Sequence, residues 1–163
     1  MDFTVTDNGP TYGGKYSLNH ESVAYLIFSR IAWYEWYPDW SYYFSDLEVS
    51  AGDVIRATVT AYSWTSGIAT IENLTNGQSG SKQLNSTYRL CGRNAEWIIE
   101  DFEDGNGNMV PFTNFDTVTF TDAMATGTGT YTPNGAKIMD IEQNNQVLTS
   151  VSIDGSSLTI QYV

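Results

Sequence analysis

The chain has 163 residues, few charged side chains and a formal net charge of −12 at pH 7. This length suits one domain with a substantial apolar core. The acidic balance argues against a nucleic-acid partner, since phosphate binding needs a basic face. It suits acid surroundings, where carboxylates are neutralised and stop repelling one another. No stretch is long and uncharged enough to span a membrane, so we expect no membrane partner either.

The first part of the chain predicts a strand and turns. Residues 2–6 have the composition of a short strand, and residues 8–10 and the Gly13–Gly14 pair mark turns. Residues 22–28 form a strongly apolar run. Such a run fits either a buried strand or one helix.

From Ala32 onward the sequence predicts short strands separated by turns. Trp33 and Glu35 share one face of the first strand, which Pro38 ends. Further strands are predicted at residues 54–61, 67–74, 82–88, 95–102, 117–120, 136–140, 146–153 and 157–162. This pattern, in a composition rich in Gly, Ser, Thr, Asn and Tyr, is typical of an all-β sandwich or barrel.

One of these strands carries an unusual number of acids: residues 95–103 read AEWIIEDFE. Alternation places Ile98, Glu100 and Phe102 on one face. A carboxylate among apolar side chains is desolvated, which raises its pKa and makes it a usable general acid or base. The alternative is a solvated strand end whose acids simply face water.

Four stretches resemble the signature of one known family. They are AWYEWYPD at 32–39, SAGD at 50–53, SGIATIENLTNGQ at 66–78, and AEWIIEDFE at 95–103 with VPF at 110–112 and Phe115 behind it. In order and spacing these stretches are similar to the eqolisins, the fungal acid glutamic peptidases. The resemblance covers nearly everything from Ala32 to Val163.

The resemblance implies a fold and an activity. The fold is a two-sheet antiparallel β-sandwich of the concanavalin or lectin type with the active site on its concave face. The activity is acid endopeptidase cleavage of protein and peptide substrates, insensitive to pepstatin and without metal or cofactor. Glu100 falls on the catalytic glutamate, with Glu35 and Asp2 in support and Trp33 and Phe102 along the substrate groove. We expect an extracellular monomer.

The sequence departs from the family at its beginning. The catalytic glutamine of eqolisins lies shortly before the residues that match Asp2 and Phe3, and none of the glutamines present matches it: Gln78, Gln83, Gln143, Gln146 and Gln161. The disulfide partner that the resemblance implies for Cys91, the only cysteine, also has no match, and no secretory signal opens the chain. We therefore expect a single glutamic-peptidase-like domain over residues 1–163, truncated at its N-terminus, with an insertion near 18–31. Whether these residues alone catalyse hydrolysis stays open.

Two other classes of function remain. Acidic, aromatic-rich sandwiches also hydrolyse or bind glycans. Glu96 and Glu100, four residues apart on one strand, would lie about 13 Å apart, too far for an inverting pair at about 6.5–9.5 Å. A cross-strand pair such as Glu35 with Glu100 is not excluded. A Ser–His or Cys–His dyad would have to use His20, the only histidine.

Two sequons allow N-glycosylation of a secreted chain, at Asn73 and at Asn85. Both are followed by a threonine two positions on. The sequence alone does not distinguish between them.

Overall fold

The structure is a computed structural model that describes residues 13–14, 23–28, 31–50, 52–90, 92, 94–99, 101 and 106–163. Of residues 13–14, 23–28 and 31 it describes the backbone alone. Regular structure in these ranges consists of strands. Within the same ranges, no helix has the length and apolar character needed to cross a membrane.

The strands form antiparallel ladders. Their bounds are β1 Gly13–Gly14, β2 Val23–Phe28, β3 Ile31–Trp36, β4 Ser41–Tyr43, β5 Ile55–Ser63, β6 Ser66–Asn73, β7 Ser79–Asn85, β8 Thr117–Phe120, β9 Ala125–Thr126, β10 Thr130–Tyr131, β11 Glu142–Gln143, β12 Gln146–Val147, β13 Thr149–Asp154 and β14 Ser157–Tyr162. Three ladders are larger, in the orders β1-β2-β3-β4, β5-β6-β7 and β13-β14-β8, and two are hairpins, β9–β10 and β11–β12.

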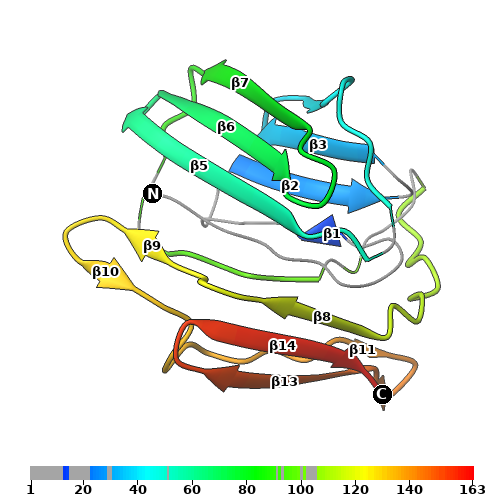
Figure 1. The fold of residues 1–163 in the computed structure, drawn as a ribbon. Helices are drawn as coiled ribbons and strands as arrows, with labels where there is room; N and C mark the ends of the chain where they lie inside the picture. Colours follow the sequence, from blue (N-terminus) through cyan, green and yellow to red (C-terminus); the bar gives the residue numbers. More distant parts are fainter. Residues whose placement is uncertain are drawn as a thin grey trace.

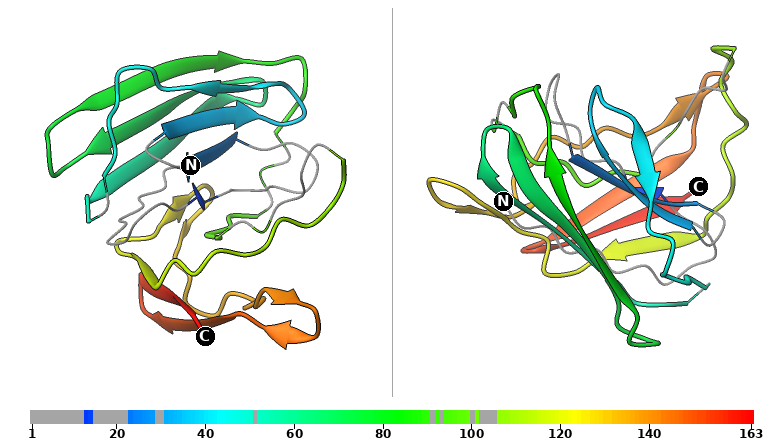
Figure 2. Two further views of the ribbon diagram at one scale, coloured as in Figure 1. Left: turned by 90° about the vertical axis from the view of Figure 1, so that its right-hand side faces the viewer. Right: turned by 90° about the horizontal axis from the view of Figure 1, so that it is seen from above.

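The ladders stack into layers. In Figure 1 the β5-β6-β7 sheet and the β2–β3 strands make up the upper half of the molecule, and β8, β14 and β13 make up the lower half. The left view of Figure 2 shows the same order, with β5–β7 above β2–β3 and with β13 and β14 at the bottom. Residues 94–99 connect β7 with the second half of the chain.

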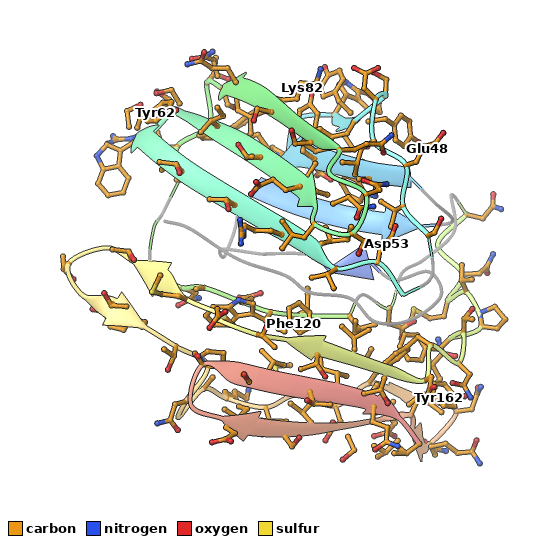
Figure 3. All side chains as sticks on the ribbon, in the orientation of Figure 1. Glu48, Asp53, Tyr62, Lys82, Phe120 and Tyr162 are labelled. Carbon is orange, nitrogen blue, oxygen red and sulfur yellow. The ribbon has the colours of Figure 1, made fainter. Side chains whose placement is uncertain are left out.

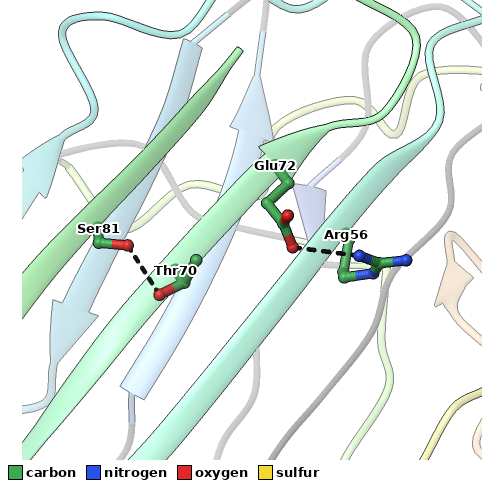
Figure 4. Close-up of polar contacts among 4 residues, drawn as sticks. All are labelled: Arg56, Thr70, Glu72 and Ser81. Carbon is green, nitrogen blue, oxygen red and sulfur yellow. Dashed lines mark hydrogen bonds and ion pairs between the residues drawn. The ribbon is translucent and has the colours of Figure 1, made fainter. Parts of the chain in front are cut away.

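The β5-β6-β7 sheet has one apolar and one polar face because its residues alternate. In β6 the buried positions are every second residue, ending with Ala69, Ile71 and Asn73. The outer face carries an ion pair at 3.4 Å between Arg56 and Glu72 and a hydrogen bond of 2.9 Å between the hydroxyls of Thr70 and Ser81 (Figure 4). These contacts are exposed, so they contribute little to stability.

Two apolar clusters form the core. The upper core consists of Ala32, Trp36, Phe44, Leu47, Val49, Ile55, Ala57, Val59, Ala69, Ile71, Leu84, Leu90 and Ala125. The lower core consists of Phe115, Val118, Phe120, Ala123, Leu158 and Ile160. Figure 3 labels Phe120 and Tyr162 in the lower half, where the Tyr162 ring lies against Phe112 and Phe115. Trp97 packs against both cores and so joins the two halves.

The prediction of an all-β, antiparallel sandwich is confirmed. The bounds predicted for β8 and β14 agree with the structure, and β3 ends before Pro38 as expected. The apolar run at 22–28 contains a strand, β2, rather than a helix. Residues 2–6 lie outside the described residues, and whether 18–31 is an insertion stays a prediction.

Two predicted strands are wrong within the described residues. Residues 136–140 form no strand, because Ile138 is 47 % and Met139 74 % exposed and their alternation has no buried face behind it. Residues 94–99 and 101 form no strand either. A strand requires a neighbouring backbone in register, and no described ladder includes this segment.

Candidate active site

Strand β3 presents two of the predicted site residues on one face. Ala32 and Trp36 are buried in the upper core. Trp33 and Glu35 therefore point to the opposite face, where both are half-buried. In the ladder with β4 they stand opposite Tyr43 and Ser41, so a short strand flanks them on one side.

The other face of β3 carries an aromatic group. The Tyr34 ring stacks on Tyr42 with 5.9 Å between centroids and meets the edge of Phe44 at 4.9 Å. Burial, with a smaller effect of Tyr42, raises the pKa of the Tyr34 hydroxyl above its ordinary value. The phenol is therefore held in its neutral form, packed among the rings of Tyr42 and Phe44.

The segment at 94–99 runs along the interior. Ala95 and Trp97 pack against the upper core, and Trp97 and Ile99 pack against the lower core. Alternating residues thus face inward, as expected for an extended chain. The segment leads directly to the predicted catalytic glutamate.

Three of the predicted site residues, Glu100, Phe102 and Asp2, lie outside the described residues. The described neighbours of Glu100 are Ile99 and Asp101. Of the predicted set, the structure places Trp33 and Glu35 together on β3.

Gln143 forms hydrogen bonds with residues next to position 100. Its Nε2 donates to Asp101 Oδ1 and to the carbonyl oxygen of Val110, each over 2.9 Å. The backbone N–H of Phe112 donates to Gln143 Oε1 over 3.3 Å. One amide thereby fixes Asp101 and the 110–112 stretch, both of which belong to the family-like signature.

Sequence reasoning missed this contact because 42 positions separate Asp101 from Gln143. No motif spacing indicates such a pair. The other glutamines are placed differently. Gln78 Oε1 accepts a hydrogen bond of 2.8 Å from the Glu48 N–H at the turn after β6, and three glutamines are exposed on strands: Gln83, Gln146 and Gln161.

A cavity of about 1020 Å³ opens beside the 94–99 segment. Residues 95–99 line one wall, and apolar side chains of β13 and β14, including Val151 and Ile160, line another. Its charged lining residues among those described are Glu96 and Lys137. The volume and apolar character suit an organic ligand or a peptide. Trp33 and Glu35 are not among the lining residues.

A metal centre has no support in the described part of the chain. There, no three His, Cys, Asp or Glu side chains gather so that they could hold an ion.

Comparison with known proteins shows the family of this chain. Residues 26–162 match the Peptidase A4 family. The chain belongs to this family. The resemblance to the eqolisins is thereby confirmed, on a match that includes the four signature stretches.

Individual relatives agree with the assignment. Aspergillopepsin-2 of Aspergillus niger is 53 % identical over 135 residues, which are 81 % of this chain and 48 % of the relative. Scytalidopepsin B of Scytalidium lignicola is 46 % identical over 141 residues, which are 81 % of this chain and 54 % of the relative. The chain thus spans about half the length of the curated relatives that it matches.

The fold also matches the solved structure of a glutamic peptidase. Scytalido-glutamic peptidase, solved with a transition state analogue inhibitor, superposes with a TM-score of 0.81 at 34 % identity. The match covers 99 % of this chain and 93 % of that one. The β-sandwich of this family is therefore the fold of the described chain.

Proposed function

We propose that this protein is an acid endopeptidase of the glutamic type, acting outside the cell as a monomer on protein and peptide substrates. The observation that carries the proposal is the family match over residues 26–162. Two relatives of this family are named for peptidase activity, Aspergillopepsin-2 and scytalidopepsin B.

Glu100 is the proposed general base. Its carboxylate takes a proton from a water molecule, whose oxygen attacks the scissile carbonyl carbon. A glutamine side-chain amide donates hydrogen bonds to the resulting oxyanion without changing its own charge. The carboxyl of Glu100 then returns the proton to the departing amine, which leaves the enzyme as it began.

The remaining predicted residues have supporting roles in this proposal. Glu35 and Asp2 help to position the catalytic groups, and Trp33 and Phe102 line the substrate groove. The shared face of Trp33 and Glu35 on β3 supports their pairing. The hydrogen bonds of Gln143 to Asp101 and Val110 support a rigid segment next to Glu100.

A glycan-directed function is the second candidate, favoured by one observation. Trp40 is 83 %, Tyr43 66 % and Tyr42 56 % exposed, and the three lie close together in the chain around β4. Tyr42 and Tyr43 are adjacent in β4 and stand opposite Tyr34 and Trp33, so they offer aromatic area on the two opposite faces of this ladder. Aromatic rings also present the flat apolar area on which sugar rings stack.

Hydrolysis assays at about pH 2–4, where we expect an acid peptidase to work, separate the two candidates by the substrate that each would cleave. A denatured protein and soluble polysaccharides are the substrates, with pepstatin present to silence aspartic peptidases. The chain is tested alone and as a chimera that begins with the residues of Aspergillopepsin-2 preceding the matched region. The chimera is included because the chain spans about half of that relative.

We expect the chimera to release peptides and to leave the polysaccharides intact. Activity of the chain alone would mean that it supplies its own oxyanion donor. Release of sugars without peptides would replace the peptidase proposal by glycan hydrolysis. Two folded proteins that release neither product would contradict both hydrolytic functions.

A further inference from the structure

The two sequons lie in different surroundings. Asn73 is the last residue of β6 and is 1 % exposed. Asn85 is the last residue of β7 and is exposed. N-glycosylation requires a reachable Asn followed two positions on by Ser or Thr, and it leaves a bulky polar group on the surface.

The Asn73 side chain is fully engaged. Its Nδ2 donates to Asp53 Oδ2 over 2.7 Å and to the carbonyl oxygen of Glu48 over 3.0 Å. Its Oδ1 accepts hydrogen bonds from the backbone N–H groups of Thr75 and Asn76 over 3.0 and 3.2 Å. Figure 3 shows Glu48 and Asp53 at the same end of the upper half. This amide closes the turn after β6.

A glycan on Asn73 conflicts with this arrangement. The N-glycosidic bond replaces one of the two N–H groups of Nδ2. Either Asp53 or the Glu48 carbonyl would therefore lose one hydrogen bond and keep only its second donor, the Ser50 N–H or the Asn76 Nδ2. Asp53 is itself only 9 % exposed, so water cannot readily replace the hydrogen bond that it would lose. A sugar also needs space that a side chain with 1 % exposure does not have.

Asn85, in contrast to Asn73, is exposed on the outer face of an edge strand. It shares the outer face of β7 with Ser81 and Gln83, which are also exposed. Thr87, the third sequon residue, is exposed as well. Strand β7 lies at the end of the β5-β6-β7 ladder, opposite β6 alone, so a glycan on Asn85 projects from the rim of the sheet into solvent.

We propose that Asn85 is the N-glycosylation site of this protein and that Asn73 is unmodified in every folded copy. This rests on the extracellular location of the proposed function. The oligosaccharide is transferred from a lipid-pyrophosphate donor. A bond forms between Asn85 Nδ2 and the anomeric carbon, the lipid pyrophosphate leaves, and one amide proton goes to solvent. A glycan there also shields an edge strand from pairing with another chain.

The test is site occupancy in the chain secreted from yeast behind a supplied signal sequence. Glycosidic amidase treatment in ¹⁸O water marks each formerly glycosylated Asn as a labelled Asp, which peptide mass spectrometry locates. We expect the label at position 85 and not at position 73 in the secreted, folded fraction. Thr87→Ala should remove the glycan without changing Asn85, and Thr87→Ser should keep it.

Translation into ER-derived microsomes gives the same readout without a need for secretion. There the wild-type chain and Thr87→Ser should carry a glycan at Asn85 that Thr87→Ala lacks. A glycan on Asn73 in the secreted protein, or an unmodified Asn85 in both systems, would overturn the proposal. Because occupancy is measured and not hydrolysis, an inactive peptidase does not affect the result.

Discussion

At the scale of single residues, buried and half-buried polar side chains hold the loops through hydrogen bonds. Asp53 and Asn73 form one hydrogen-bonded pair, and Asp53 Oδ2 also accepts from the Ser50 N–H over 2.8 Å. Gln143 plays the corresponding part next to position 100. At both sites one side-chain amide forms hydrogen bonds with several backbone groups. Removing that side chain therefore leaves more than one backbone group without its hydrogen bond.

Asp53→Ala should lower the free energy of unfolding by about 1–3 kcal/mol. The reason is that the change leaves the buried Nδ2 of Asn73 with one acceptor fewer. Urea denaturation measures the loss, with the exposed Asp46→Ala as the matched control, expected within about 0.5 kcal/mol of wild type. Equal losses in the two variants would show that the pair does not stabilise the turn.

Gln143→Ala should also destabilise the chain by about 1–3 kcal/mol, since Asp101 and the Val110 carbonyl lose their donor. Gln143→Glu gives a sharper readout. At neutral pH it sets two negative charges against each other at hydrogen-bond distance, and at low pH protonation removes the repulsion.

We therefore expect Gln143→Glu to lose more stability at pH 7 than at pH 3, whereas Gln143→Ala should lose similar amounts at both. Urea titrations at the two pH values provide the comparison. A Gln143→Glu variant that is equally stable relative to wild type at both pH values would place Asp101 away from residue 143.

At the scale of elements, the sequence predicted strands well where alternation coincides with burial. In β8 and β14 every second residue is buried, among them Val118, Phe120 and Ile160, and the predicted bounds hold. Residues 136–140 were also predicted as a strand, but Ile138 and Met139 are adjacent and would fall on opposite faces, and all five residues are exposed. Periodicity reports a face and does not report whether another layer covers it.

The β5–β6 pair offers a test of how closely its backbones approach. A Cβ added at Gly67 would lie 2.7 Å from the backbone oxygen of Thr60, and one added at Gly80 would lie 2.7 Å from Phe44 Cδ1. A backbone in a ladder cannot yield without losing register, whereas a ring can turn.

Gly67→Ala should therefore lower the free energy of unfolding by about 1–3 kcal/mol. Gly80→Ala should lower it by less. Urea denaturation of both variants beside wild type checks the order. A smaller loss for Gly67→Ala would mean that β5 and β6 are less closely paired than their register indicates.

At the scale of the whole molecule, Trp97 links the two cores. It belongs to residues 95–103, one of the stretches that resemble the family signature. The sequence predicts a functional role for this segment from its acids and its resemblance. It could not reveal that Trp97 packs against both halves or that Gln143 holds Asp101, because both contacts join parts of the chain far apart in sequence. Glu35 and Trp33 were predictable as partners because they lie two residues apart on one strand.

Trp97→Ala should lower the free energy of unfolding by about 3–5 kcal/mol, as expected for a large aromatic side chain removed from a packed site. Thermal and urea unfolding give the loss, and Trp40→Ala, which removes a side chain that is 83 % exposed, is the control. Losses of similar size in the two variants would contradict the role of Trp97 as the joint between the cores.

The central claim is that hydrolysis depends on the Glu100 carboxyl. Its most direct test is the rate of peptide release at about pH 2–4, with pepstatin present, by the active form of the protein and by its Glu100→Gln variant. Glu72→Gln, on the outer face of the β5-β6-β7 sheet, serves as the control. We predict that Glu100→Gln lowers the rate by about 10²–10⁴-fold, the usual contribution of a general base, with folding intact and the control unchanged. A Glu100→Gln protein that cleaves as fast as wild type would contradict the account.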